Sequence, residues 1–233
     1  MTVTSNQHWY MALEMNVVNP PLSSRKDRAR ATRLRMLRAA QHAFIEHGYA
    51  GARMSYIAEQ AGVAVQTLYI TFHTKPELLQ ACYELAVLGE DDPTPPSQQP
   101  WYTAAMASRT GPRALRHFAE GVAAIVARVA VLDDVVRSAS HEPAATRVRE
   151  HGEWLRRDGY RAITELVAER FGLRPRLTID TGTDLLMTLA GPAIYRQLVV
   201  DYRWSHEDYV SWLSTTLTDQ LLTSKKITSA NNK

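Results

Sequence analysis

This chain has almost no cysteine and no long apolar run. A single cysteine, Cys82, among 233 residues excludes an internal disulfide framework and is typical of a reducing compartment. No run of about 18 uncharged apolar residues occurs, so no membrane span is predicted. The first residues, MTVTSNQHWYMALEMNVV, have neither a basic start nor a continuous apolar core, and they do not indicate a secretion signal. These absences predict a cytoplasmic protein.

Residue groups that carry catalysis or hold metals are also scarce. The eight histidines are scattered. The nearest pairs, His42 with His47 and His141 with His151, lack the i, i+4 spacing that places two metal ligands on one helix face. Neither a serine nucleophile elbow nor a phosphate-binding loop occurs. We therefore predict no enzyme, no metal site and no cofactor, and an α-helical enzyme is the least favoured alternative.

Positive charge is modest overall and concentrated near the N-terminus. The net charge is +3, yet residues 25–80 hold nine Lys and Arg against four Asp and Glu, while residues 81–233 hold eighteen against nineteen. A local excess of this kind suits a polyanion such as nucleic acid. The alternative is an ordinary solvated basic face.

Residues 54–72, MSYIAEQAGVAVQTLYITF, have the pattern of a helix-turn-helix. Ile57, Ala58 and Ala61 share one face of a first short helix. Gly62 then provides the positive φ that a tight turn between two helices needs. This pattern predicts a compact pair of helices.

The second helix of the pair presents polar and aromatic side chains outward. Leu68 and Phe72, four residues apart, give it a single buried side. The side chains left to point elsewhere are Gln66, Thr67, Tyr69, Ile70 and Thr71. So short a helix is not stable alone, and its outward side in this motif usually enters the major groove of DNA.

Helical periodicity predicts an all-α chain of about nine helices. An amphipathic helix is expected at roughly 28–47 with Gly48 as its C-terminal cap, and Thr74 with Glu77 fits a capping box that starts another helix. Further helices are expected at about 112–131, 132–140, 144–171, 177–202 and from 205 onward. The Gly191-Pro192 pair should kink the helix at 177–202, because proline removes one backbone donor.

Residues 32–79 strongly resemble the DNA-binding domain of the TetR family of transcriptional regulators. The resemblance is continuous and rests on these residues: the Thr32-Arg33 start, the alanine pair before Phe44, Gly48-Tyr49, Ile57-Ala58, Ala61-Gly62-Val63, Thr67-Leu68-Tyr69, Phe72 and Lys75 followed by Leu78-Leu79. The C-terminal part is similar only more loosely, at Ala190-Gly191-Pro192 followed by Tyr195. The resemblance implies an all-α homodimer whose C-terminal domain binds a small ligand and whose last two long helices form a four-helix dimer interface.

The resemblance and the proline-rich stretch at 89–100 together predict the domain organisation. We expect a flexible N-terminal extension at 1–24 and a helix-turn-helix DNA-binding domain at 25–88. A linker and connection at 89–111 lead to a regulatory and dimerisation domain at 112–225, and a tail follows at 226–233.

Several residues of the second helix and its surroundings are expected to contact DNA. Carried over by position, Tyr69 and Lys75 match the phosphate-contacting pair of the family, and Thr67 is placed to face DNA. Gln66 is expected to read bases, because its amide can pair bidentately with adenine. Ile70 stands where the family more often has a polar or aromatic residue, and packs either on a thymine methyl or on a backbone sugar. The alternative for Thr67 and Tyr69 is that they only pack the motif.

Two positions depart from the family pattern. Ala52-Arg53 and Ala64 stand where relatives often have Ser or Thr at the N-termini of the second and third helices. Each loses a helix cap worth about 1 kcal/mol and a hydroxyl that can touch a phosphate, and the charge of Arg53 is expected to compensate. Arg33 and the basic residues at 25–30 are expected to form an arm that enters an adjacent minor groove.

Two further sets of residues are predicted in the C-terminal half. Nine positions, most of them ring-bearing, are candidates for the lining of a ligand pocket: Trp101, Tyr102, Met106, His117, Phe118, Trp154, Tyr160, Met187 and Tyr195. Rings with few converging charges predict a small hydrophobic or weakly polar ligand, and most of these rings are expected to be core. Apolar positions of the last two helices are candidates for the dimer interface: Leu186, Ala190, Ile194, Trp212, Leu213 and Leu217.

The leading hypothesis is a dimeric repressor that a ligand releases from a pseudo-palindromic operator. Two recognition helices held about 34 Å apart would fit successive major grooves. The alternative is a constitutive DNA-binding regulator or an activator without a small-molecule effector, which a fully packed C-terminal core would favour. The predicted partners are double-stranded operator DNA, a small-molecule effector and a second copy of the chain.

Overall fold

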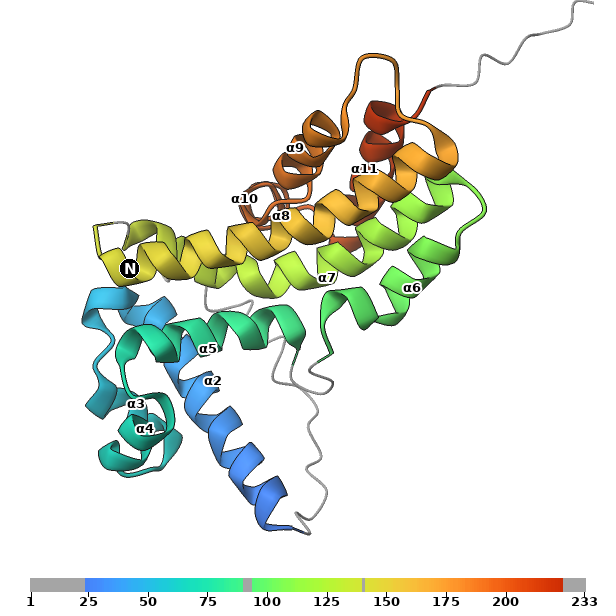
Figure 1. The fold of residues 1–233 in the computed structure, drawn as a ribbon. Helices are drawn as coiled ribbons and strands as arrows, with labels where there is room; N and C mark the ends of the chain where they lie inside the picture. Colours follow the sequence, from blue (N-terminus) through green and yellow to red (C-terminus); the bar gives the residue numbers. More distant parts are fainter. Residues whose placement is uncertain (1–23, 90–93, 140, 224–233) are drawn as a thin grey trace, which may run out of the picture.

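The computed structural model describes residues 24–89, 94–139 and 141–223, and helices dominate these ranges (Figure 1). No strand occurs within them apart from an isolated bridge between Leu173 and Leu222. The prediction of an all-α fold is confirmed. The predicted extension (apart from Ser24) and the predicted tail lie outside the described residues. None of the described helices is long and apolar enough to cross a membrane.

Four helices make up the N-terminal domain: α2 (Arg25–Gly51), α3 (Met54–Ala61), α4 (Val65–Phe72) and α5 (Lys75–Leu88). α2 begins earlier than the predicted residue 28, because Ser24 and Asp27 form a complete capping box. The residues of the expected basic arm, from Arg25 to Arg33, are helical, and their contact with a minor groove stays a prediction. Gly48 interrupts α2 with a φ of 68°, as its predicted role at a helix end requires.

The remaining helices form the C-terminal part of the chain. After a single 3₁₀ turn at Pro96–Gln98 they follow in this order: α6 (Pro100–Ala107), α7 (Gly111–Ser138), α8 (Pro143–Phe171), α9 (Ile179–Leu189), α10 (Pro192–Tyr195) and α11 (His206–Leu221). A π-helical turn, Arg196–Asp201, continues α10. In Figure 1, α7 and α8 lie side by side across the middle of the molecule, with α5 against one end of them and α9 and α11 at the other.

The prediction of a separate helix at 132–140 is wrong, because α7 runs without interruption from Gly111 to Ser138. The apolar stripe of α7 changes partners along its length. Ala123 and Val126 pack with the C-terminal helices, whereas Leu132 and Val136 pack with the N-terminal domain. α7 is therefore one continuous helix with two apolar stripes. The sequence pattern suggested two helices because each stripe has its own direction.

Two hydrophobic cores result from this arrangement. The first contains the buried residues of α2–α5, Ala145 and Val148 of α8, and the end of α7. The second joins α6, the first part of α7, the later part of α8 and the helices from α9 to α11. Both α7 and α8 therefore contribute residues to both cores and join the two halves of the chain.

Candidate nucleic-acid interface

The helix-turn-helix is formed by α3 and α4, joined by a three-residue turn. Gly62 has a φ of 65°, and the amides of Gly62 and Val63 donate to carbonyls of the last turn of α3. Ile57, Ala58 and Leu68 are fully buried, which fixes α4 against the other helices of the domain. The predicted turn residue is therefore the one that reverses the chain.

The outward face of α4 consists of side chains that do not pack in the core. Tyr69 is 46% exposed and Ile70 is 76% exposed, and Gln66 and Thr67 are also exposed. Thr71 differs from them because its hydroxyl donates to the carbonyl of Thr67, 2.8 Å away. The face therefore offers one amide, one phenol and one branched apolar side chain to a partner.

Arg33 of α2 lies against Phe72, on the buried side of α4. Its guanidinium is 4.5 Å from the centre of the Phe72 ring, over the ring face. Phe72 itself is only 3% exposed. Arg33 thus supports the position of α4 and keeps a positive charge close to it.

Lys75, at the start of α5, is engaged within the domain. Its ammonium donates to the carbonyl of Ala50, 3.1 Å away, and lies 4.8 Å from the centre of the Tyr49 ring. Burial lowers the pKa of Lys75, and the carboxylate of Glu142 partly opposes this shift. Thr74 caps the same helix by accepting from the amide of Glu77. Lys75 therefore joins α5 to the end of α2 and carries a charge beside the first amides of α5.

The N-termini of α3 and α4 have no capping side chain among the described residues. Arg53 and Ala64 occupy the N-cap positions of α3 and α4. In the described part of the chain, neither side chain accepts a hydrogen bond from an amide of its helix. The first amides of a helix without a cap need another acceptor. These two helix ends, both in the helix-turn-helix, therefore suit an anion such as a DNA phosphate.

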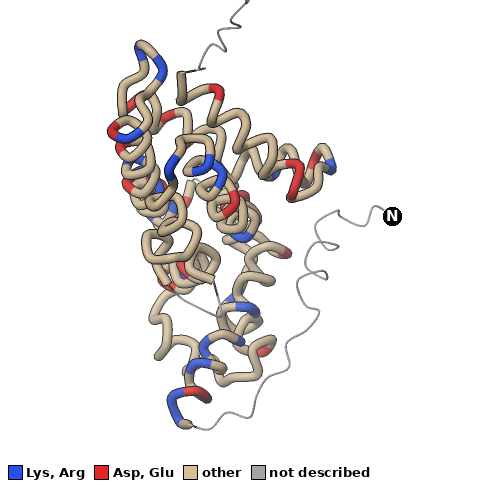
Figure 2. The backbone as a smooth tube through the Cα atoms, turned by 90° about the vertical axis from the view of Figure 1, so that its right-hand side faces the viewer, with Lys and Arg blue, Asp and Glu red and all other residues tan. Residues whose placement is uncertain are grey.

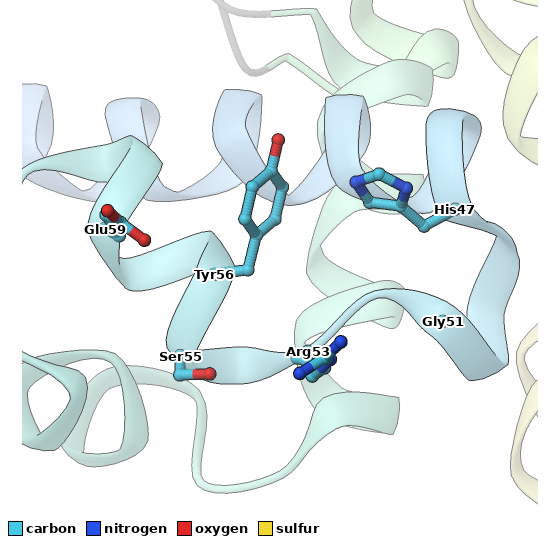
Figure 3. A pocket seen from close by; sticks show the side chains of 6 residues that line it. All are labelled: His47, Gly51, Arg53, Ser55, Tyr56 and Glu59. Atoms are coloured by element: carbon cyan, nitrogen blue, oxygen red, sulfur yellow. The ribbon is translucent and has the colours of Figure 1, made fainter.

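A hollow of about 670 Å³ lies beside the start of α3 (Figure 3). Arg53 and Ser55 lie at the beginning of α3, and the rings of His47 and Tyr56 meet edge to face, with centres 5.1 Å apart. Gly51 and Glu59 complete the lining. Sequence reasoning missed His47, Ser55 and Tyr56. α3 lacks a capping hydroxyl at its N-cap position, and Ser55 is its second residue. A hydroxyl at this place in the sequence was the signal that could have identified the site.

Charge is distributed as the sequence predicts. Figure 2 shows Lys and Arg gathered on the N-terminal domain, with few Asp and Glu among them, while acidic and basic segments are mixed over the C-terminal helices. The charged residues of α3, α4 and the first turn of α5 are Arg53, Glu59, Lys75 and Glu77. Most of the basic excess therefore belongs to α2.

The nine ligand-pocket candidates do not all come together. Rings of α6, α7 and α8 form a chain in which Trp101 meets Phe118 at 6.3 Å and Phe118 meets Tyr160 at 5.1 Å between centres. Tyr102 contacts Trp101, and Tyr195 packs on Tyr209. Of the remaining candidates, Met106 and Trp154 are exposed, His117 is half-buried, and Met187 packs against the edge of the second core.

Trp101 closes this ring chain on one side. Its indole lies so close to Gly121 of α7 that a Cβ at that position would be 2.0 Å from an indole carbon. The indole N–H donates to the side-chain oxygen of Gln99, 2.8 Å away. Only glycine therefore permits the present position of Trp101 on α7.

The chain breaks between α9 and α10, as the Gly191-Pro192 pair predicted. Proline lacks one backbone donor, and because α9 ends at Leu189 the last carbonyls of this helix have no amide of a following turn to accept from. Arg156 donates to the carbonyl of Met187 at 3.3 Å and Tyr160 to that of Ala190 at 2.9 Å. Tyr209 approaches the carbonyl of Leu189 at 3.4 Å. Three side chains from α8 and α11 thus replace the missing backbone donors.

Arg156 and Arg128 are residues whose roles sequence reasoning missed. Arg128 of α7 donates to the carbonyls of Ala86 and Val87, 2.7 and 3.1 Å away, at the end of α5. A cation suits this position, because the C-terminal end of a helix is partially negative. Nothing in the sequence distinguishes these two arginines from the others, because their partners are 31 to 42 residues away along the chain.

Four of the six predicted interface residues are buried within one protomer. Ile194 and Trp212 are the two that keep exposed surface, so direct contact with a second copy would involve these two. The fully buried residues pack in the second core: Leu186, Ala190, Leu213 and Leu217.

A second hollow, of about 530 Å³, lies between α7 and α11. It is lined by an ion pair between Arg116 and Glu120 and by polar side chains of α11, among them His206. None of the nine ligand-pocket candidates lines either hollow. Within the described residues no group of three or more His, Cys, Asp or Glu is placed to hold a metal ion. Cys82 is fully buried, and burial raises the pKa of its thiol.

Comparison with known families and structures agrees with this geometry. Residues 36–82 match the family model for bacterial regulatory proteins of the tetR family. Among curated proteins, no sequence matches the chain significantly.

Solved structures resemble the fold over most of the chain. NalD, the secondary repressor of the MexAB-OprM multidrug efflux pump in Pseudomonas aeruginosa, is 18% identical, with 85% of this chain and 99% of that chain covered at a TM-score of 0.64. FadR from Bacillus subtilis, in complex with stearoyl-CoA, is 14% identical, with coverage of 79% and 96% at a TM-score of 0.60. At these identities the likeness establishes the fold alone.

Proposed function

We propose that this chain, which belongs to the TetR family of transcriptional regulators, binds an operator as a dimer through α4. It would repress transcription until an effector releases it from the DNA. The observation that carries the proposal is the outward face of α4. Gln66, Tyr69 and Ile70 are exposed there, next to helix ends that suit phosphates. The protein would act in the cytoplasm on DNA and carry no catalytic activity.

The contacts with DNA divide into two kinds. Tyr69, Lys75, Thr67 and Arg53 would hold phosphates, with Arg53 acting beside the free amides of α3. An ammonium has three donors, so Lys75 can keep its bond to the Ala50 carbonyl and still meet a phosphate. Gln66 would read an adenine in the major groove.

Dimerisation would place two copies of α4 on successive turns of DNA, about 34 Å apart. Ile194 and Trp212 lie on α10 and α11, and each keeps part of its apolar side chain exposed. Tyr202, 61% exposed, follows the π-helical turn. We propose that these side chains meet the corresponding ones of a second copy.

The effector would enter at the rings of α6, α7 and α8. Trp101 rests on Gly121 and covers Phe118, which in turn meets Tyr160. Displacement of the indole would expose an apolar space with two ring faces, suited to a small hydrophobic or weakly polar molecule.

α8 offers a direct route from that site to the N-terminal domain. Gly152, Arg156 and Tyr160 lie at i, i+4 and i+8 on one face of the helix. Tyr160 contacts the ring chain, Arg156 holds the end of α9, and Gly152 lies against the ring of Tyr83 in α5. A rotation of α8 around its axis would therefore displace α5, to which α4 is attached.

Selection of binding sequences from random DNA by the full-length protein tests the proposal. We expect a pseudo-palindrome whose half-site centres are one helical turn apart or a multiple of it. Gln66→Ala should bind this operator about tenfold more weakly while keeping its affinity for random DNA. Equal losses on operator and random DNA would contradict base reading by Gln66, and failure to enrich any sequence would contradict the proposed function.

One observation favours constitutive DNA binding as the second candidate. The rings of Trp101, Phe118 and Tyr160 fill the region where the effector would enter. Thermal unfolding with a panel of apolar metabolites distinguishes the two candidates, because a ligand of the native state raises the melting temperature. Stabilisation by a compound that also dissociates the operator complex would favour the repressor, and a panel without any effect would favour the constitutive regulator.

A further inference from the structure

Ile70 is the most exposed large hydrophobic residue among the described residues, with 76% of its surface accessible. It lies between two residues that are almost fully buried, Leu68 and Phe72. At about 100° per residue, Ile70 points directly away from the side of α4 that these two share. It therefore contributes little to the stability of the fold, and its apolar side chain remains uncovered in the free protein.

The surroundings of Ile70 are polar. Gln66 precedes it by four residues and lies on the same outward stripe, and Thr67 and Tyr69 lie on either side of that stripe. All three are exposed. The face thus has one apolar side chain at its centre, with hydrogen-bonding groups at one end and along the edges.

This arrangement matches one chemical feature of the major groove. The thymine 5-methyl group is the apolar group that base edges present there. Backbone sugars, in contrast, lie along the walls of the groove. The central stripe of an inserted helix faces the base edges and its flanks face the walls, so Tyr69 and Thr67 are the residues placed near sugars and phosphates.

We propose that Ile70 reads a thymine methyl in each half-site, an inference that rests on the proposed function of α4 and makes it more specific. Four helical residues rise about 6 Å, and successive base pairs are about 3.4 Å apart. The thymine that Ile70 contacts therefore lies within about two base pairs of the adenine that Gln66 contacts. α4 reads a short A·T-containing step through one hydrogen-bonding and one apolar side chain.

Replacement of thymine by deoxyuridine tests this contact, because uracil pairs with adenine as thymine does and lacks only the 5-methyl group. In the operator selected by the wild-type protein, each thymine of both half-sites is replaced in turn. We expect affinity to fall about fourfold at one position of each half-site and to stay constant elsewhere. That position should lie within two base pairs of the one at which Gln66→Ala loses its preference.

Variants then assign the effect to the side chain. Ile70→Ala should bind thymine and uracil operators equally, whereas Ile70→Val should keep a reduced preference for thymine. Leu155→Ala removes an apolar side chain that is 51% exposed on α8 and should retain the full preference. Equal melting temperatures for Ile70→Ala and the wild type would show that the fold is intact.

The possible failures can be told apart. An operator that is selected and bound tightly, with no response to uracil at any position, would overturn the thymine contact and leave the proposed function standing. A response to uracil that persists in Ile70→Ala would assign the methyl to another residue and overturn the proposal. If no sequence is enriched at all, the proposed function itself fails, and the reading of thymine fails with it.

Discussion

The outward face of α4 and the break between α9 and α10 use polar side chains in opposite ways. On α4, Gln66 and Tyr69 are exposed, and neither bonds the core. At the break, Arg156, Tyr160 and Tyr209 donate to backbone carbonyls of the same chain. The difference teaches that the polar face of α4 is available to a partner such as DNA, whereas the three polar side chains at the break already have partners within the chain.

This contrast has an energetic consequence. A side chain on the outward face of α4 can change without affecting the fold, so its identity is free to follow a DNA sequence. A side chain at the break stabilises the end of α9, where the last carbonyls lack amides of a following turn, and its loss leaves a carbonyl unsatisfied. The two regions should therefore respond to substitution in different measurements.

The largest expected effect comes from two apolar residues of α4, two positions apart. Leu68→Ala should reduce the free energy of unfolding by about 2–5 kcal/mol, because it opens a cavity in a fully buried site. Ile70→Ala should change it by no more than about 0.5 kcal/mol. Denaturant unfolding measures both, and comparable losses would contradict the assignment of Ile70 to DNA contact alone.

At the break, Arg156→Gln should cost about 1–3 kcal/mol, because the carbonyl of Met187 loses a charged donor. Arg157→Gln is the matched control on the same helix, since Arg157 makes an exposed ion pair with Asp184 and such pairs contribute at most about 1 kcal/mol. Thermal unfolding measures the two variants side by side. A greater loss for Arg157→Gln would contradict the stabilising role of Arg156.

The phosphate contacts should have an intermediate effect that is independent of DNA sequence. Tyr69→Phe and Lys75→Ala should each weaken operator and random DNA alike, by roughly three- to tenfold, because each removes one backbone contact. Lys75→Ala should also reduce the slope of log affinity against log salt by about one. Fluorescence anisotropy over a salt series measures both quantities, and a loss confined to the operator would contradict phosphate contact.

The smallest effect concerns Asp133, a buried carboxyl of α7. Burial raises its pKa above the ordinary value of 3.8, although Arg137 and Arg156 oppose this shift. A raised pKa in the folded state means that ionisation costs stability, and the cost develops as the pH rises through that pKa. Asp133→Asn should therefore melt up to about 2 °C higher than the wild type at pH 8, with the difference vanishing toward pH 4.

Thermal melting of both proteins between pH 4 and pH 8 measures this difference. A variant that melts lower than the wild type at pH 8 would show that the interactions of the carboxylate with the two arginines outweigh its burial. DNA affinity should be the same for both proteins, because Asp133 lies in the end of α7 and not on α4.

Local patterns predicted much of the N-terminal domain. Gly62 reverses the chain where its freedom to adopt positive φ suggested, and Leu68 and Phe72 are the buried side of α4. Arg33 shows the limit of such patterns. Its basic neighbourhood suggested an arm that enters a minor groove of DNA, whereas its guanidinium lies on the ring of Phe72. A charge in the sequence does not reveal which ring will be adjacent to it.

The C-terminal half was predicted less completely. The break at Pro192 followed from the missing amide of proline, but the donors at the end of α9 come from α8 and α11, 20 to 31 residues away along the chain. α7 was divided into two helices because its stripe turns from one core to the other. The effector pocket and the dimer interface stay proposals for the same reason: each depends on faces that helices present to distant parts of the chain or to another copy.

The sequence by itself determined the helical class of this protein, the position of its helix-turn-helix and the residues that point outward from α4. Those features depend on helical periodicity and on the backbone freedom of glycine, which act within a few residues. Tertiary structure alone decided that Arg128 caps α5, that Arg156 holds the end of α9, and that Trp101 rests on Gly121. These contacts join residues far apart in the chain, and only the packing of whole helices brings them together.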